Sequence, residues 1–370
     1  MVISASEQYS KRVDVRHVID RLTLKYGPVA YIIHQAISIL MAEFPPTLDD
    51  VQEHLDDIAE AKLALADLIA RPTIKQRTPE WYEARMGMIT ASDFAQALGA
   101  GKFGTQKQLI WKKCMPSSDD WASLANCPPI KWGCMYEDVA QQIYCRRNKV
   151  VMHEFGLVKH PTVDHLGASP DGISELGVML EIKCPYKREI TGEVPLQYYY
   201  QIQGQLLVCG LKSCDFLELG FKELPRDAFY EKQKNERGIV VEIFKDGGNT
   251  YVYSGVDWDR EALEAFEHIH RQDTDFVKFH YWRVNVYSCV RITRDVDFVE
   301  KMVPEIRSVW ARIEAYRKDE KLMEDEIGLP PLPEKKKRKE YVFRDVKTTT
   351  VIPTTIPIID EEESPKYAFR

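Results

Sequence analysis

The chain has 370 residues, of which 44% are hydrophobic and 29% charged, so it can bury a core and is not disordered throughout. The 57 acidic residues outnumber the 50 basic ones, for a formal net charge of −7. This balance excludes a protein coated with positive charge, such as a histone, but a local basic cleft can still sit on an acidic body.

Cysteine use and the N-terminal sequence bear on the compartment. None of the eight cysteines forms a C-x-x-C pair, which argues against a zinc ribbon or a redox dithiol. Scattered thiols in a chain of this length favour a reducing compartment. The first residues contain no apolar signal segment, and the most apolar stretch, residues 29–44, is too short for a bilayer span. We therefore expect a soluble intracellular protein that does not enter a membrane.

The first predicted unit is an N-terminal helical region at residues 1–74. Apolar residues between Val51 and Ile69 recur at close to a 3.6-residue period, and Pro45-Pro46 divides the region into two helical parts. The region is expected to form a helical layer packed on the rest of the chain, with a separate partner-binding module as the alternative.

Residues 75–327 alternate between helical and strand-like patterns. This alternation predicts an α/β domain in which a central mixed β-sheet is flanked by helices. The expected helices lie near 81–85, from 92 onward, and at 133–147, 195–209, 259–269 and 296–316. The expected strands lie at 156–160, 165–169, 178–184, 215–221, 238–244, 251–253 and 284–293.

The last segment, residues 328–370, is rich in proline, threonine and charge, and is expected to be a disordered or loosely docked tail. It contains five consecutive basic residues, Lys335 to Lys339. This run resembles a nuclear localisation signal, and a patch with affinity for DNA is the alternative.

The segment SPDGISELGVMLEIKCP, residues 169–185, carries the main chemical signal. Pro170-Asp171-Gly172 predicts a turn, and a second turn at 174–177 makes the unit a hairpin. Along the following strand, Glu181 and Lys183 share one face while the other face is apolar. The ordinary interpretation is a solvated sheet face with a weak salt bridge.

The hairpin would bring Asp171 beside Glu181. Two carboxylates held together repel each other unless a cation lies between them, and their oxygens suit Mg²⁺ or Mn²⁺ rather than zinc. The backbone carbonyl of Ile182 is a natural additional ligand. Lys183 could orient an attacking water and stabilise negative charge on a phosphate. Cys184 would point away from the metals and is expected to be structural.

A further carboxylate, Glu137, lies on the predicted helix WGCMYEDVAQQIYCRR. Gly133 and Ala140 share its face, and their small side chains would let this helix lie close to the sheet. An exposed helical glutamate without a catalytic role is the alternative.

The order G-x-x-x-E, S-P-D-G, E-x-K and Q-x-Q resembles the PD-(D/E)xK nuclease superfamily. More narrowly, it is similar to the phage lambda exonuclease or YqaJ-type viral recombinase group, which also occurs in large DNA viruses of eukaryotes. The narrower likeness depends on residues 77–94, 132–185 and 198–206. It spans about residues 77–317, so the N-terminal region and the tail lie outside it.

This resemblance implies a restriction-endonuclease-like core and a metal-dependent 5′→3′ deoxyribonuclease that acts on ends of double-stranded DNA in viral recombination, repair or replication. It implies two Mg²⁺ or Mn²⁺ ions and Lys183 as the residue that positions water. The implied metal ligands are Glu137, Asp171, Glu181 and the Ile182 carbonyl. The implied pocket for a 5′-phosphate comprises Arg85, Ser92, Ser169 and Gln201, with Tyr198 beside it.

The residues of the phosphate pocket have ordinary alternatives. Arg85 could pair with Glu80 or Glu83, and Ser92 could be a plain helix cap. Gln201 could be a polar position on an amphipathic helix, and Tyr198 could belong to the core.

Basic residues between 107 and 188 are candidates to grip DNA without sequence selectivity. They are Lys107, Lys112, Lys113, Arg146, Arg147, Lys149, Lys183, Lys187 and Arg188. The family resemblance implies a monomer or a homotrimer, with a single-strand annealing protein as a possible partner. The expected location is the host nucleus or a cytoplasmic site of viral replication. An alkaline-nuclease-like endonuclease and a catalytically silent DNA- or protein-binding module remain the alternatives.

Overall fold

The computed structural model describes residues 48–115, 127–231, 236–245, 248–256 and 258–330. The tail run Lys335–Lys339 and the first 47 residues lie outside the described residues. The boundaries expected at 74/75 and 327/328 therefore stay predictions. Among the described residues, no helix is both long and apolar enough to cross a membrane.

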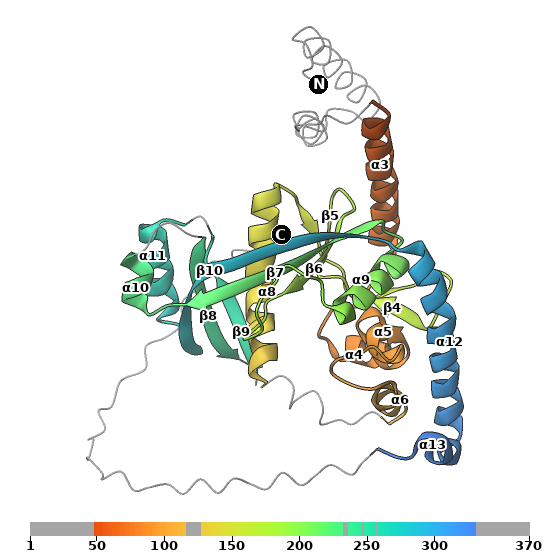
Figure 1. The fold of residues 1–370 in the computed structure, drawn as a ribbon. Helices are drawn as coiled ribbons and strands as arrows, with labels where there is room; N and C mark the ends of the chain where they lie inside the picture. Colours follow the sequence, from red (N-terminus) through yellow and green to blue (C-terminus); the bar gives the residue numbers. More distant parts are fainter. Residues whose placement is uncertain (1–47, 116–126, 232–235, 246–247, 257, 331–370) are drawn as a thin grey trace, which may run out of the picture. The chain divides into compact units, whose positions relative to one another are not determined.

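The centre of the fold is a seven-stranded sheet with the strand order β2-β5-β6-β7-β10-β8-β9 (Figure 1). Its strands are β2 (Met152–His153), β5 (Gly172–Ser174), β6 (Met179–Lys183), β7 (Ser213–Glu223), β8 (Arg237–Lys245), β9 (Gly248–Tyr253) and β10 (Phe276–Thr293). β6 and β7 run parallel, whereas the other neighbours are antiparallel. The expected central mixed sheet is confirmed.

A second, three-stranded sheet has the order β1-β4-β3. It consists of β1 (Ile89–Thr90), β4 (Leu166–Ala168) and β3 (Val158–Lys159). β1 and β4 are parallel, with Ile89 opposite Leu166. This pairing joins the segment that carries Ser92 to the segment that leads into Asp171.

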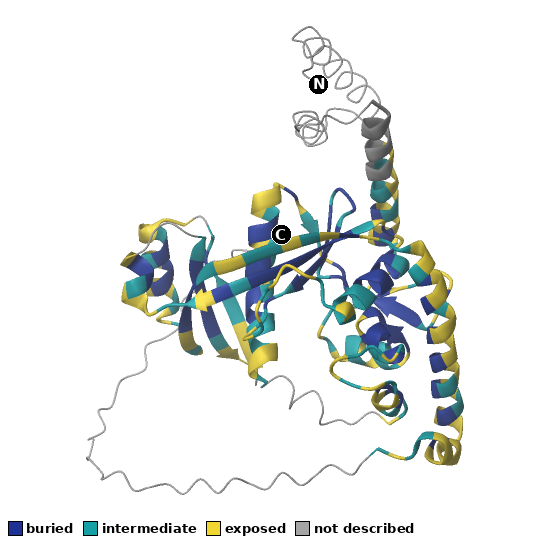
Figure 2. Ribbon diagram, viewed as in Figure 1, coloured by how far each residue is buried: buried dark blue, intermediate teal, exposed yellow. Residues whose placement is uncertain are grey.

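Helices cover both faces of the large sheet, as expected, and alternation along β6 separates the two cores. Met179 belongs to the core formed with α9 (Leu196–Cys209) and α12 (Val296–Lys318). Leu180 and Ile182 belong to the core formed with α8 (Pro128–Asn148). In Figure 2 buried residues of α8 lie beside the sheet, and α12 packs against α9.

The remaining helices surround these layers. α3 (Leu48–Ala70) buries Leu65 and Leu68 in the α9–α12 core, so the end of this helix packs on the rest of the chain; the helical layer expected over residues 1–74 stays a prediction. The others are α4 (Pro79–Met86), the 3₁₀ helix η1 (Ala91–Asp93), α5 (Phe94–Ala97), α6 (Gln106–Cys114), α10 (Arg226–Glu231), α11 (Arg260–His270) and α13 (Glu320–Ile327). Helices α6, α10 and α13 were not expected from the sequence.

Candidate active site

The hairpin of β5 and β6 places Asp171 beside β6. Gly172 pairs with Leu180, so Asp171 lies just before the paired part of β5. The backbone N–H of Ile182 donates a 2.7 Å hydrogen bond to Oδ2 of Asp171. The hairpin expected from the two turns is therefore present, and it fixes the orientation of the Asp171 carboxylate.

The Glu181 carboxylate lies on the α9 face of β6 together with Lys183, and the two side chains form an ion pair. Glu181 is fully buried, so this face is not the solvated sheet surface that the ordinary interpretation assumed. Gln201 donates to Oε1 of Glu181 and Gln205 to Oε2, each over 2.7 Å. Both glutamines lie on α9, four residues apart and therefore on one side of that helix.

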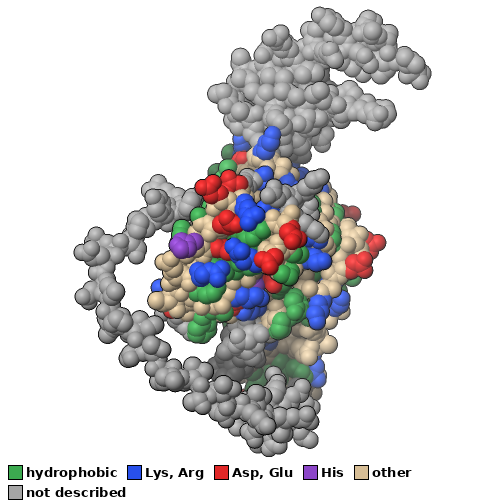
Figure 3. Space-filling model, turned by 90° about the vertical axis from the view of Figure 1, so that its left-hand side faces the viewer, with side chains coloured by type: hydrophobic (Ala, Val, Ile, Leu, Met, Phe, Trp, Pro, Cys, Tyr) green, Lys and Arg blue, Asp and Glu red, His purple; other side chains and the backbone are tan. Residues whose placement is uncertain are grey.

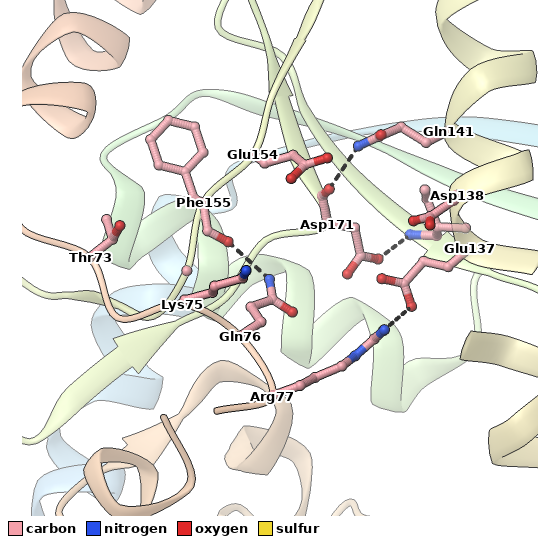
Figure 4. A pocket seen from close by; sticks show the side chains of 12 residues that line it. Thr73, Lys75, Gln76, Arg77, Glu137, Asp138, Gln141, Glu154, Phe155 and Asp171 are labelled. Atoms are coloured by element: carbon pink, nitrogen blue, oxygen red, sulfur yellow. Dashed lines mark hydrogen bonds and ion pairs between the residues drawn. The ribbon is translucent and has the colours of Figure 1, made fainter. Parts of the chain in front are cut away.

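Helix α8 brings Glu137 to the same region. Glu137, Asp171 and Ile182 all line one cavity of about 580 Å³. Figure 4 shows the carboxylates of Glu137 and Asp171 directed toward each other across this cavity. Close packing of α8 depends on buried Ala140; an added Cβ at Gly133 would meet no heavy atom within 4 Å, so that expectation for Gly133 was wrong.

The local charges are strongly coupled. Burial, reinforced by the negative charges of Glu181 and Glu137, holds the pKa of Asp171 well above its ordinary value. Burial also raises the pKa of Glu137, against the attraction of Arg77 and Lys183. Although burial disfavours an ammonium, the carboxylates of Glu181 and Asp171 raise the pKa of Lys183, which stays protonated. A cation placed near Asp171 would relieve the repulsion between these carboxylates.

The carboxylates of the cavity suit a hard divalent cation because two of them, from Asp171 and Glu137, lie together. Among the residues that the structure describes, no three His, Cys, Asp or Glu side chains converge to form a metal site alone. Mg²⁺, however, is held in proteins by one or two carboxylates, with water and substrate phosphate completing its shell. Asp171 and Glu137 offer such a pair, whereas both oxygens of Glu181 already accept hydrogen bonds.

Three of the residues expected to bind a 5′-phosphate, Arg85, Ser92 and Ser169, are linked through Trp81, whereas Gln201 binds Glu181 instead. Nη2 of Arg85 donates a 2.9 Å hydrogen bond to Oγ of Ser92, and the guanidinium lies 4.3 Å from the centre of the Trp81 ring. Nε1 of Trp81 donates to Oγ of Ser169 over 3.1 Å. Ser169 precedes Pro170-Asp171, so Trp81 links the Arg85 side of the site to the carboxylates.

The ordinary alternatives for Arg85 and Ser92 do not hold. Among the ion pairs of the described residues, none joins Arg85 to Glu80 or Glu83. Thr90, not Ser92, caps η1, since Thr90 and Asp93 form the capping box. Ser92 is exposed, and its hydroxyl contacts both Arg85 and Thr90.

Tyr198 and Gln201 both face β6, as their spacing on one helical face indicated. The Lys183 ammonium lies 5.1 Å from the centre of the Tyr198 ring, a cation–π contact, while Gln201 binds Glu181. Tyr198 also packs against the core next to Phe216. Core packing and a place beside the site are therefore compatible for this residue.

Sequence reasoning missed three residues that the structure places at the site. The i, i+4 spacing of Gln205 with Gln201 was a signal for it, whereas the Q-x-Q motif pairs Gln201 with Gln203. Gln203 binds the backbone of Thr293 and Asp295 and does not contact Glu181. Trp81 lies in the segment 77–94 that carries the family resemblance but had no assigned role. Arg77, the third, carried no signal in the sequence that set it apart.

The expectation about basic residues is corrected in part. Lys113 is only 3% exposed and pairs with Asp93 over 2.9 Å, so it does not belong to a DNA-gripping surface. Arg147 pairs with Glu236, and Arg188 with Glu218. On the face shown in Figure 3, acidic and basic side chains are interspersed and form no continuous basic field.

The chain is similar to a family of viral recombinase domains, to a viral protein and to solved exonuclease structures. Residues 80–212 match the family model of the YqaJ-like viral recombinase domain, and every predicted site residue lies within this segment. A protein of Acanthamoeba polyphaga mimivirus, "Uncharacterized protein R354", is 23% identical over 66% of this chain. This chain spans only 54% of that protein.

Among solved structures, an alkaline exonuclease from Laribacter hongkongensis is 22% identical with a TM-score of 0.43, covering 66% of this chain and 97% of the other. A phage-related exonuclease from Haemophilus somnus is 12% identical with a TM-score of 0.36, covering 64% of this chain and 96% of the other.

Proposed function

We propose that the protein is a divalent-metal-dependent exonuclease that degrades double-stranded DNA from its 5′ ends, and the match of residues 80–212 to the model of the YqaJ-like viral recombinase domain supports this proposal. One observation carries the proposal. Within the matched segment, Glu137 and Asp171 face each other across a cavity, and the buried Glu181–Lys183 pair lies on the strand that binds Asp171. Paired carboxylates can hold a catalytic metal ion, and a fixed ammonium beside them can stabilise the charge that develops during phosphodiester hydrolysis.

Each side chain has a proposed task. Asp171 and Glu137 would hold the cation, with the Ile182 carbonyl as a further ligand. Bound Mg²⁺ or Mn²⁺, in one or two positions, would polarise the phosphate and lower the pKa of a bound water. Lys183 would orient that water and stabilise the charge that develops on the phosphate oxygens.

Glu181 would hold Lys183 in place, because its own carboxylate is fixed by Gln201 and Gln205. We propose that Glu181 acts mainly by this positioning and reaches a second cation only if one of these bonds opens. The role of Glu181 as a direct metal ligand, expected from the sequence, is therefore proposed only for a state in which one of these hydrogen bonds is open.

The Arg85 group would select the end of the strand. A guanidinium and a hydroxyl are suitable ligands for a terminal phosphate, and the Arg85–Ser92 pair presents both. Ser169, held by Trp81, would add a third donor close to Asp171. This arrangement supports attack on the bond next to a 5′-phosphorylated end.

The direct experiment uses linear duplex DNA labelled at internal nucleotides, with and without Mg²⁺, and with either a 5′-phosphate or a 5′-hydroxyl. The proposal predicts Mg²⁺-dependent release of nucleotides, faster from the phosphorylated end. Cutting of closed circles would favour an endonuclease, and binding without cutting would favour a silent DNA-binding module. Lys183→Met should lower the rate about 100-fold or more while the protein stays folded.

Partners and location are proposals too. The domain type supports a role in recombination, repair or replication of a viral genome, with a single-strand annealing protein as partner. Such work would take place in the host nucleus or at a cytoplasmic site of viral replication. Gel filtration with light scattering would distinguish a monomer from a homotrimer.

A further inference from the structure

The cavity beside Asp171 contains an arginine with a constrained backbone. Arg77 has φ = 65°, a left-handed conformation that non-glycine residues rarely adopt. The chain is fixed on both sides of it. Gln76 donates to the carbonyls of Phe155 and Pro170 over 3.0 and 3.3 Å, and Thr78 caps α4. The strain at Arg77 is therefore maintained by its neighbours.

This conformation directs the side chain of Arg77 toward the carboxylates, as Figure 4 shows. Nη2 of Arg77 donates a 2.9 Å hydrogen bond to Oε2 of Glu137. The side chain of Arg77 is 51% exposed, and within the part of the chain that the structure describes the bond to Glu137 is its one side-chain hydrogen bond. A guanidinium has five N–H donors in a planar fork, so donors remain for a second oxygen ligand.

The charge of the cavity gives Arg77 a function. Four carboxylates line it, from Glu137, Asp138, Glu154 and Asp171, against the two cations of Lys75 and Arg77. A DNA phosphate could approach such a wall only beside a positive group. Arg77 lies next to the carboxylates, whereas Arg85, one helix further along the chain, bonds to Ser92.

We propose that Arg77 binds a non-bridging oxygen of the phosphodiester that is cut, while it keeps its bond to Glu137. This assignment rests on the proposed nuclease function. It adds a substrate-binding residue that lies before the segment matched by the family model. Arg77 would then place the phosphate next to the Glu137–Asp171 pair, and Arg85 would hold the phosphate at the strand end.

The rival role is structural: Arg77 could merely neutralise Glu137. The two roles predict different changes in DNA affinity when a single phosphate is made neutral. A structural arginine affects Glu137 whatever the DNA carries, whereas a phosphate ligand loses its partner when that phosphate is made neutral.

The test measures DNA affinity in EDTA, so that no cleavage occurs, by fluorescence anisotropy of a 5′-phosphorylated duplex. One duplex is unmodified, one has a neutral methylphosphonate at the first linkage from the 5′ end, and one has it far inside the duplex. Wild type is compared with Arg77→Gln and Arg77→Lys. Arg260→Gln is the matched control, since Arg260 pairs with Glu264 on α11 and lies outside the cavity.

The expected result is a loss of affinity of about tenfold for Arg77→Gln on unmodified DNA. The slope of log K against log salt should fall by about 0.9. The terminal methylphosphonate should weaken wild type by a similar factor and leave Arg77→Gln unchanged, whereas the internal one should weaken both proteins equally. Arg77→Lys should retain the salt slope, and Arg260→Gln should match wild type.

Equal losses from the terminal methylphosphonate in wild type and Arg77→Gln would overturn the assignment of Arg77. A failure of wild type to degrade linear duplex DNA in the presence of Mg²⁺ or Mn²⁺ would instead contradict the proposed nuclease function. Circular dichroism of Arg77→Gln would show whether it has the wild-type fold. If it does not, Arg77→Lys on the same three duplexes decides the question.

Discussion

The amide of Gln205 donates a 2.7 Å hydrogen bond to Oε2 of Glu181, and both side chains are almost completely buried. A buried carboxylate is costly unless its oxygens find donors. Gln205 therefore stabilises the ionised carboxylate that pairs with Lys183, although it reaches no solvent itself.

Replacing Gln205 by leucine should expose this dependence. Gln205→Leu leaves Oε2 of Glu181 without its donor, and the free energy of unfolding should fall by about 1–3 kcal/mol. Cleavage should fall as well, because Lys183 loses its fixed partner. Urea denaturation and a nuclease assay on linear duplex DNA would measure the two effects.

Gln203→Leu is the matched control for Gln205→Leu. Gln203 lies on the same helix and bonds to the backbone of Thr293 and Asp295, so its loss should also lower stability. Cleavage by the folded protein should be unchanged. Equal losses of cleavage in the two variants would mean that Gln205 acts only through general stability.

The pH dependence of stability follows from Asp171. The pKa of Asp171 is higher in the folded state than the ordinary value of 3.8, which applies to the unfolded chain. At a pH between the unfolded and the folded pKa, the folded protein therefore binds more protons than the unfolded chain. Stability without metal should therefore fall as the pH rises through this interval. Glu137, whose pKa is also raised, contributes in the same direction.

Chemical denaturation in EDTA at a series of pH values would measure this slope. Asp171→Asn should make the slope shallower without abolishing it, since Glu137 remains. Mn²⁺ should restore stability to wild type at the upper end of the range, because it binds the folded, ionised site. A wild-type protein that becomes more stable over the same pH interval would rule out the repulsion described for Asp171.

Arg85 should govern the preference for a phosphorylated end. Arg85→Gln removes the guanidinium that bonds to Ser92, so the rate on 5′-phosphorylated duplex should fall about tenfold toward the rate on 5′-hydroxyl duplex. The ratio of the two rates is the measurement. A ratio that stays at the wild-type value would place the phosphate pocket elsewhere.

Lys113 should matter for stability and not for DNA affinity. It is buried against Asp93 and also donates a 2.7 Å hydrogen bond to the carbonyl of Arg85. Lys113→Met leaves the Asp93 charge unpaired, which should cost about 3–5 kcal/mol. Arg260→Met, which breaks an exposed pair with Glu264, should cost no more than about 0.5 kcal/mol. Thermal or urea unfolding of both variants would show the difference.

Local sequence patterns anticipated much of the fold around the site. The turns at 170–172 and 174–177 predicted the β5–β6 hairpin, and alternation along β6 placed Glu181 and Lys183 on one face. These features depend only on neighbouring residues. The sequence pattern also predicted helices in the regions of α8, α9 and α12.

Local patterns could not predict which helix packs on each face of β6. The sequence does not show that α9 packs on the charged face of β6, and this packing converts a solvated ion pair into a buried one. Lysine is likewise a residue type that usually lies at the surface, and only the ion pair with Asp93 explains why Lys113 is buried. The left-handed backbone of Arg77 depends on the anchors formed by Gln76 and Thr78, which join distant segments.

The most direct measurement for the whole account is the anomalous scattering of Mn²⁺ in crystals of the protein. The account predicts a peak in the cavity, within ligand distance of the carboxylates of Asp171 and Glu137, and its loss in Asp171→Asn. No peak at this pair in crystals of a protein that degrades DNA with Mn²⁺, or a peak bound by other residues, would contradict the assignment of the catalytic centre.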